Sequence, residues 1–131
     1  MEHDGQVERT RERERFRRDS RLRSSQDFQR VRRRGRRQQG QWLILVYARR
    51  VAADSATLPA RIGFSVNKRV GSAVKRNRVK RRLREAIRRR LWKAQFGWDM
   101  IVIARPEAAD VEYSRLADEL YDLLTRARLL R

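Results

Sequence analysis

Cysteine is absent from this 131-residue sequence, and histidine occurs only once, as His3. Without cysteine the chain can form neither disulfide bonds nor thiolate metal sites. His3 lies in the N-terminal segment and is interpreted as a solvent-exposed bystander. The sequence also lacks an acidic cluster of the kind that a two-metal nuclease uses. It therefore predicts no catalytic residue on the protein, and it leaves any metal position unknown.

Long apolar runs are absent as well. No stretch approaches the roughly 20 residues that a membrane-spanning helix needs, and the first residues have no apolar core of a secretory signal. These absences predict a soluble protein in the cytoplasm, with no membrane partner.

Acidic residues are scarce relative to basic ones. The chain has 35 Lys and Arg against 16 Asp and Glu, which gives a formal net charge of +19. Such an excess of like charge opposes compaction unless a polyanion balances it. This favours nucleic acid as the partner, with an anionic membrane as the weaker alternative. Because 40% of the residues are hydrophobic, the chain also has apolar side chains for one small domain.

The sequence divides into an arm and a domain. Residues 1–20 mix Glu and Arg and have almost no apolar content, so we expect a disordered arm; an exposed helix with Glu–Arg pairs is the alternative. Residues 21–131 form the predicted domain. Its first helix is expected within residues 21–35, where Ser24 and Asp27 have capping-box spacing and Gly35 suits a helix end.

Three apolar segments have the pattern of strands. Residues 42–47 indicate a strand buried on both faces, and residues 61–68 a second strand that pairs antiparallel with it. Residues 100–104, preceded by Asp99, indicate a central strand, and residues 36–42 leave room for a fourth. Residues 72–93 and 113–130 have apolar side chains at helical spacing. The first of these helices joins two strands in a βαβ unit, which general rules expect to be right-handed.

The helix at 72–93 concentrates positive charge, with eleven Lys or Arg and a single acid, Glu85. Residues 107–122 instead contain six acids and one base. Like charges one helical turn apart repel by a few tenths of a kcal/mol per pair, and bound phosphates relieve that repulsion. The pattern predicts a polyanion-binding face, with a merely solvated helix face as the alternative. Asn77 is either a nucleotide contact or a polar residue tolerated on an exposed face.

Residues 61–89, RIGFSVNKRVGSAVKRNRVKRRLREAIRR, resemble the signature of the bacterial ribonuclease P protein component. That signature is a strand ending in Ser-x-x-Lys-Lys/Arg, followed by Gly-x-Ala-Val-x-Arg-Asn-Arg-x-Lys-Arg and then Arg-Glu. The segment RLRSSQDFQRVRRRG is similar to the family's first helix, and DMIVIARP is similar to its last strand. The resemblance covers roughly residues 21 to 130.

The resemblance implies an α+β fold, a small α/β sandwich of order αβββαβα of the ribosomal protein S5 domain 2-like type. It also implies an unusual left-handed βαβ crossover, which replaces the right-handed default. The implied function is that of a subunit of ribonuclease P, the ribonucleoprotein endoribonuclease that removes the 5′ leader from precursor tRNA. Catalysis would reside mainly in the partner RNA, which would also hold most of the Mg²⁺.

The implied partners are the catalytic RNA and precursor tRNA, and we expect the isolated protein to be monomeric. The protein would raise the affinity for substrate and for Mg²⁺. The helix with the Arg-Asn-Arg motif would contact the catalytic RNA. Its implied contact residues, with those of the preceding turn, are Lys68, Arg69, Arg76, Asn77, Arg78, Lys80, Arg81, Arg84 and Arg88.

The single-stranded leader would lie in a cleft between the first helix and the sheet. The implied cleft residues are Phe28, Arg32, Tyr47 and Ser65. Arg32 departs from the family, which commonly has an aromatic residue there, so the leader preference stays open; a guanidinium can also stack on a base. For Phe28 and Tyr47, a place in the core is the alternative.

Two other functions fit the charge and the small α/β fold. One is a structural RNA binder such as a ribosomal protein, which would co-purify with ribosomal subunits. The other is a nucleoid-type DNA binder, which would bind duplex DNA as tightly as structured RNA. Neither explains the register of the motif from Ser65 to Glu85.

Overall fold

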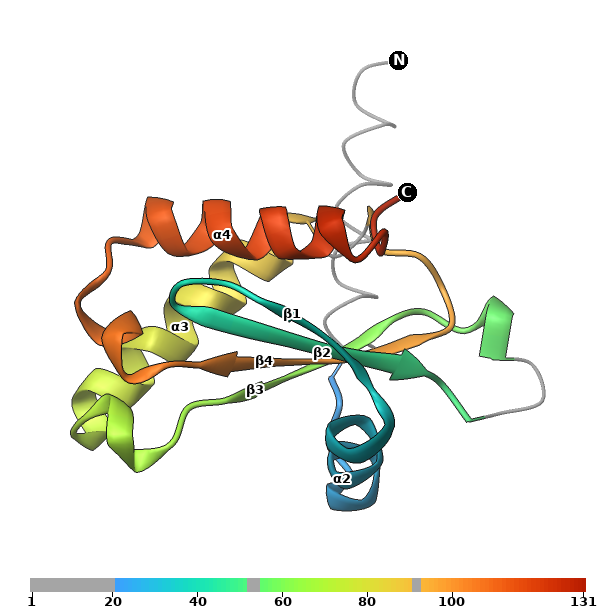
Figure 1. The fold of residues 1–131 in the computed structure, drawn as a ribbon, viewed down its shortest axis with the longest axis horizontal. Coiled ribbons are helices and arrows are strands. Elements are labelled where there is room, and N and C mark those ends of the chain that lie inside the picture. The colour runs from blue at the N-terminus through green and yellow to red at the C-terminus, as the bar shows by residue number, and fades with distance from the viewer. Residues whose placement is uncertain (1–20, 52–54, 91–92) are drawn as a thin grey trace, which may run out of the picture.

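The computed structural model describes residues 21–51, 55–90 and 93–131 (Figure 1). The predicted arm, with His3, lies outside the described residues. In chain order the elements are α2 (Ser25–Arg34), β1 (Arg36–Gln39), β2 (Leu43–Arg49), β3 (Arg61–Ser65), α3 (Ala73–Arg90), β4 (Trp98–Ala104) and α4 (Tyr113–Arg126). This αβββαβα order confirms the predicted fold class, including a strand in the segment 36–42.

The four strands form one sheet in the order β1-β2-β4-β3. β4 is antiparallel to β2 and parallel to β3. The prediction that β2 and β3 pair with each other is therefore wrong. β4 takes the place between them because a central strand is covered on both faces and needs apolar residues on both, as the buried run Met100–Val102 provides. The left-handed crossover from β3 through α3 to β4 stays a prediction.

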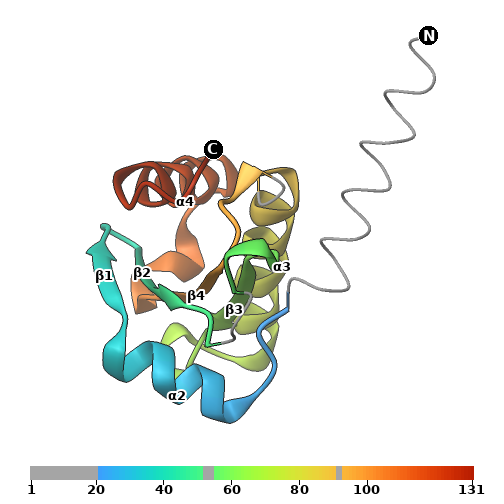
Figure 2. The same ribbon diagram turned by 90° about the vertical axis from the view of Figure 1, so that its right-hand side faces the viewer.

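The sheet separates two apolar layers. α3 and α4 lie on one face and α2 lies on the other (Figures 1 and 2). Side chains of a strand alternate between faces, so Leu43 and Leu45 of β2 pack in the larger core with Leu83 and Leu120. Val46 points the other way, into a smaller cluster on the α2 side. That cluster consists of Leu22, Val31, Val46 and Ile101.

The helix ends follow the predicted capping. Ser24 Oγ accepts a hydrogen bond from the Asp27 amide at 3.4 Å, and Ser72 Oγ accepts one from the Lys75 amide at 3.3 Å. Such side-chain acceptors satisfy amides that the first helical turn leaves unpaired. The first helix begins directly after its Ser24 cap, and the preceding residues lie beside β3, where the Leu22 amide donates to the Ile62 carbonyl at 3.0 Å.

The β1–β2 hairpin is tied to α4 through Glu119. Its carboxylate accepts hydrogen bonds from the amides of Gln41, Trp42 and Leu43 at 2.5, 2.8 and 2.8 Å. A Cβ atom at Gly40 would lie 2.6 Å from the carboxyl carbon of Glu119, so a larger residue here would displace this carboxylate. The hairpin is thereby held against the helical layer.

The apolar stripe of α3 anchors that helix as expected. Val79, Leu83, Ala86 and Ile87 are buried, whereas Leu91, which continues the same spacing in the sequence, lies outside the described residues. In the part of the chain that the structure describes, no helix is long and apolar enough to span a bilayer.

Candidate nucleic-acid interface

The outer face of α3 presents most of the residues that the sequence predicted to contact RNA. Burial of the apolar stripe orients α3, so its basic side chains point away from the core. The exposed members of the predicted set are Lys68, Arg69, Asn77, Arg78, Arg81, Arg84 and Arg88, and the half-buried ones are Arg76 and Lys80. The predicted residues thus lie on the part of α3, and of the turn before it, that is turned away from the core, although they point to more than one side of the helix.

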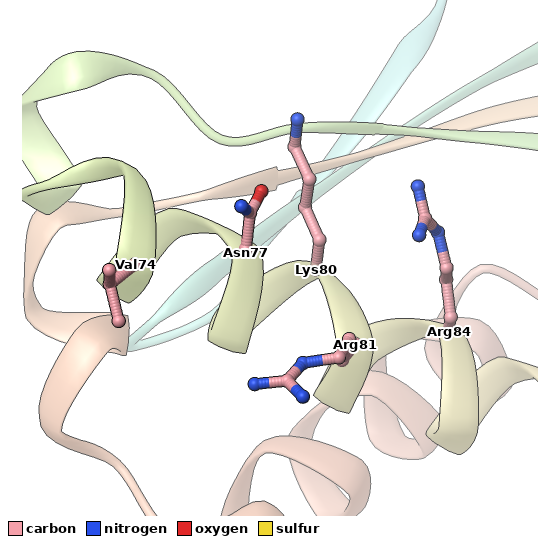
Figure 3. A pocket seen from close by; sticks show the side chains of 5 residues that line it. All are labelled: Val74, Asn77, Lys80, Arg81 and Arg84. Carbon is pink, nitrogen blue, oxygen red and sulfur yellow. The ribbon is translucent and has the colours of Figure 1, made fainter.

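A hollow of about 530 Å³ lies on this surface (Figure 3). It is lined by Val74, Asn77, Lys80, Arg81 and Arg84. Figure 3 shows the side chains of Asn77, Lys80 and Arg84 extending from the same side of the helix, while that of Arg81 extends from another side. The three cations can bind phosphate oxygens, and the amide of Asn77 can donate and accept hydrogen bonds. Val74, 68% exposed, adds an apolar surface of the kind that a base or ribose can cover.

The cations of α3 are not equivalent. Arg88 donates to Glu85 at 3.0 Å, which offsets part of its charge. Arg82 turns inward and donates from Nη1 to the Val111 carbonyl at 2.6 Å, so it joins α3 to the segment before α4. Arg76 has its Nε buried without a hydrogen-bond partner among the described residues. The surface from Arg76 to Arg84 therefore has the most charge available for a polyanion.

Three of the four predicted cleft residues lie between α2 and the sheet. Arg32 Nη2 donates to Ser65 Oγ at 2.6 Å, which joins α2 to the end of β3. Phe28 is half-buried and packs with the α2-side cluster. Its ring lies directly over Gly63, where a Cβ atom would be 2.2 Å from the ring carbon Cζ.

Tyr47 does not join them, and its expected place in the cleft is corrected. Its ring is 7% exposed and belongs to the larger core on the α3 and α4 side. It packs edge-on against Trp98, with the ring centroids 5.8 Å apart. The cause is strand alternation, because the residues of β2 that face α2 are the even-numbered ones, such as Ile44 and Val46.

A buried ion network fastens α2 to the sheet. Asp99 of β4 is fully buried, and Arg61 of β3 donates to its two carboxylate oxygens at 2.8 Å each. Arg30 of α2 donates to the same carboxylate and, at 2.8 Å, to the carbonyl of Arg49 at the end of β2. Asp27 completes the group with contacts of 3.3 Å to Arg30 and 3.4 Å to Arg61. Two cations thus balance two carboxylates beneath the helix.

The hydrogen bond and charge of Asp99 raise the pKa of the Arg61 guanidinium above its ordinary value, although partial burial opposes this. Arg61 is therefore cationic throughout the usual pH range. A carboxylate with no exposed surface needs such compensation, because an unpaired charge in the interior is strongly unfavourable.

Sequence reasoning missed this network. It placed Asp99 before the strand, whereas β4 begins at Trp98 and Asp99 lies within it. The available signal was a single acid at the start of an otherwise apolar segment, together with an arginine, Arg61, at the start of another. Charges at such positions are rarely buried unless they are paired.

The described residues do not fit a metal site held by the protein. Within the three described ranges there is no group of three or more His, Cys, Asp or Glu side chains arranged to hold a metal ion. Asp27 and Asp99, the acids nearest the α2 cleft, are already bound to arginines.

Comparison with protein families gives one clear result. The family model described as Ribonuclease P matches residues 16–128 of the chain. The ribonuclease P protein component of Chloroflexus aurantiacus is 45% identical over 116 residues, which cover 88% of this chain and 82% of the relative. That of Streptomyces avermitilis is 42% identical, covering 82% of this chain and 91% of the relative.

Solved structures agree with this result. The RNase P protein of Staphylococcus aureus superimposes with a TM-score of 0.75 at 28% identity, over 85% of this chain and 97% of that one. The RNase P protein of Thermotoga maritima gives a TM-score of 0.70 at 27% identity, over 82% of this chain and 96% of that one. The similarity thus extends over nearly the whole described fold.

Proposed function

Because this chain belongs to the ribonuclease P protein family, we propose that it binds the RNA subunit through α3 and the 5′ leader of precursor tRNA beside α2. Family membership makes it the protein component of an endoribonuclease complex that processes tRNA, with the RNase P RNA as its partner. What is proposed is which surface of the protein binds the RNA subunit and which binds the leader.

The observation that carries the proposal is the basic hollow on α3. Its cations have no acidic neighbour among the lining residues, and Val74 and Asn77 precede them along the helix. Arginine forks bind phosphate oxygens two at a time, and each phosphate contact releases counterions. The mixture of cations, an amide and an apolar side chain suits a folded RNA with phosphates and an accessible nucleotide.

The leader is assigned to the α2 side of the sheet because single strands favour basic grooves with stacking surfaces. Phe28 offers a partly exposed ring, and Arg32 offers a planar cation at the mouth of the gap. When the leader binds, Arg32 exchanges its neutral hydroxyl partner, Ser65, for a phosphate or a base. The charge-assisted bond to a phosphate is the stronger one.

Catalysis is assigned to the partner RNA, with Mg²⁺ held mainly by that RNA. The described protein residues supply cations and hydrogen-bond donors that bind and orient the RNA and its substrate. By adding positive charge beside the RNA–substrate junction, the protein lowers the concentration of Mg²⁺ needed for cleavage. The isolated protein is proposed to be a monomer.

Reconstitution with the cognate RNA subunit tests the proposal. Cleavage of a precursor tRNA is measured against Mg²⁺ concentration, with and without protein, and the affinities for precursor and mature tRNA are compared. We expect the protein to shift cleavage to lower Mg²⁺ and to favour the precursor. Unchanged cleavage at low Mg²⁺ and equal affinity for both tRNAs would show that the assignment is wrong.

A further inference from the structure

The network of Arg30, Asp99 and Arg61 has a geometry that goes beyond simple charge compensation. Arg30 extends from α2 to two strands at once, the carboxylate of Asp99 on β4 and the carbonyl of Arg49 on β2. Arg61 binds the same carboxylate from β3. One helix is thus held by directional bonds that involve three strands.

The other contacts of α2 with the sheet leave its orientation less defined. Val31 and Phe28 pack through apolar surfaces, and this attraction is non-directional, so it constrains small rotations of the helix less strictly than hydrogen bonds do. The bond from Arg32 to Ser65 is exposed to solvent and has to open when a ligand takes its place. The network is thus the contact of α2 that directs hydrogen bonds to a fully buried carboxylate.

Rotation of α2 would change the proposed leader site, because the residues of the network and the residues of that site lie on different faces of the same short helix. Asp27 and Arg30 are three residues apart and face the network, whereas Phe28 and Arg32 are four apart and face the cleft. A helix with ten residues moves as a unit. A change in the direction of Arg30 therefore displaces the ring of Phe28 and the guanidinium of Arg32 together.

We propose that Arg30, through its bonds to Asp99 and Arg49, is a positioning residue that sets the width of the leader cleft and so the preference for precursor over mature tRNA. Arg30 does not touch the leader; its side chain is only 17% exposed. This inference rests on the proposed leader site beside α2.

The experiment compares three variants in the holoenzyme reconstituted with the cognate RNA subunit. Arg30→Met removes both bonds. Arg30→Lys retains the charge, but a single ammonium cannot reproduce the forked contact of a guanidinium. Arg33→Met removes the same charge from the exposed side of the same helix and serves as the matched control. The readout is the ratio of the dissociation constants for mature and precursor tRNA.

We expect Arg30→Met and Arg30→Lys to lower this ratio by roughly tenfold, because small displacements of positioned groups reduce function by up to about a hundredfold. Arg33→Met should weaken the binding of mature and precursor tRNA equally, and chiefly at low salt. The affinity for the RNA subunit should change no more in the Arg30 variants than in the control. A wild-type ratio in Arg30→Lys would overturn the proposal, since it would mean that charge alone suffices.

Thermal unfolding of each variant separates positioning from loss of the fold. If Arg30→Met does not fold, Arg30→Lys alone decides the question, because it keeps two cations beside Asp99. Equal weakening of precursor and mature tRNA in a folded Arg30 variant would reduce the network to a structural role. If the wild-type protein itself shows no preference for the precursor, the proposed leader site fails, and the inference fails with it.

Discussion

Phe28 of α2 and Gly63 of β3 are in such close contact that a methyl group at position 63 would lie 2.2 Å from the phenyl ring. No Cβ atom tolerates that distance, so the missing side chain of Gly63 is what allows the ring to lie on the sheet. The pair limits how closely α2 approaches β3, next to the hydrogen bond from Arg32 to Ser65.

Gly63→Ala should therefore destabilise the protein by displacing the ring. Forcing an extra methyl group into a packed contact costs about 1–3 kcal/mol. In a Phe28→Ala background the same substitution should cost clearly less, because the colliding ring is gone. Urea unfolding of the two single variants and the double variant measures this coupling. Equal costs in both backgrounds would mean that the strain at position 63 arises from other atoms.

Phe28→Ala should mainly weaken binding of precursor tRNA relative to mature tRNA. Stacking of one base on an aromatic side chain is worth about 1–3 kcal/mol, so the preference for the precursor should fall roughly five- to a hundredfold. Competition binding with the reconstituted holoenzyme gives the two affinities. Equal losses for both substrates would show that Phe28 acts only as a packing residue.

Arg78→Ala and Arg76→Ala should weaken assembly with the RNA subunit. Removal of one phosphate contact should lower the slope of log affinity against log salt by about one. Titration of the RNA subunit at several salt concentrations measures this slope. Arg82→Ala is the control from the same helix, because Arg82 donates inward to Val111. Arg82→Ala should reduce stability and leave the slope unchanged. If it changes the slope as much as Arg76→Ala or Arg78→Ala does, the assigned orientation of α3 is contradicted.

Asp99→Asn should lower stability strongly. Loss of one partner from a buried ion pair costs about 3–5 kcal/mol, because Arg30 and Arg61 would then share the single carboxylate of Asp27. For a chain of this size that corresponds to a fall in Tm of roughly 10 °C or more. Asp122→Asn is the control, since its exposed pair with Arg126 should contribute at most about 1 kcal/mol. Similar small effects of both substitutions would show that the network does not stabilise the fold.

The pH dependence of the network follows from the raised pKa of Arg61. A group whose pKa is raised by folding contributes its stabilisation below its unfolded pKa and loses it as pH rises through the folded value. For an arginine both values lie beyond the ordinary range. Substitution of the network residues, and not a change of pH, therefore tests their contribution to stability. The free energy of unfolding measured over roughly pH 6 to 9 should show no transition from Arg61.

Local patterns predicted the elements well. The Ser24 cap, the buried stripe of α3 and the leucine stripe of α4 were all readable, because capping and helical periodicity depend on residues a few positions apart. The exposed position of most residues proposed to contact RNA could also be predicted, since one helix carries almost all of them and the motif gives their register. Tyr47 was misplaced because a shift of one residue in a strand moves a side chain to the other face.

By itself, the sequence determined the order of elements, the charged face of α3 and the family to which the chain belongs. Each of these depends on local spacing or on a contiguous motif. Only the tertiary structure decided that β4 separates β2 from β3, that Tyr47 belongs to the core, and that Asp99 lies buried between Arg30 and Arg61. Those outcomes depend on which distant segments of the chain come into contact. Local sequence leaves several pairings open, and the choice among them is made by long-range packing and by charge compensation in the interior.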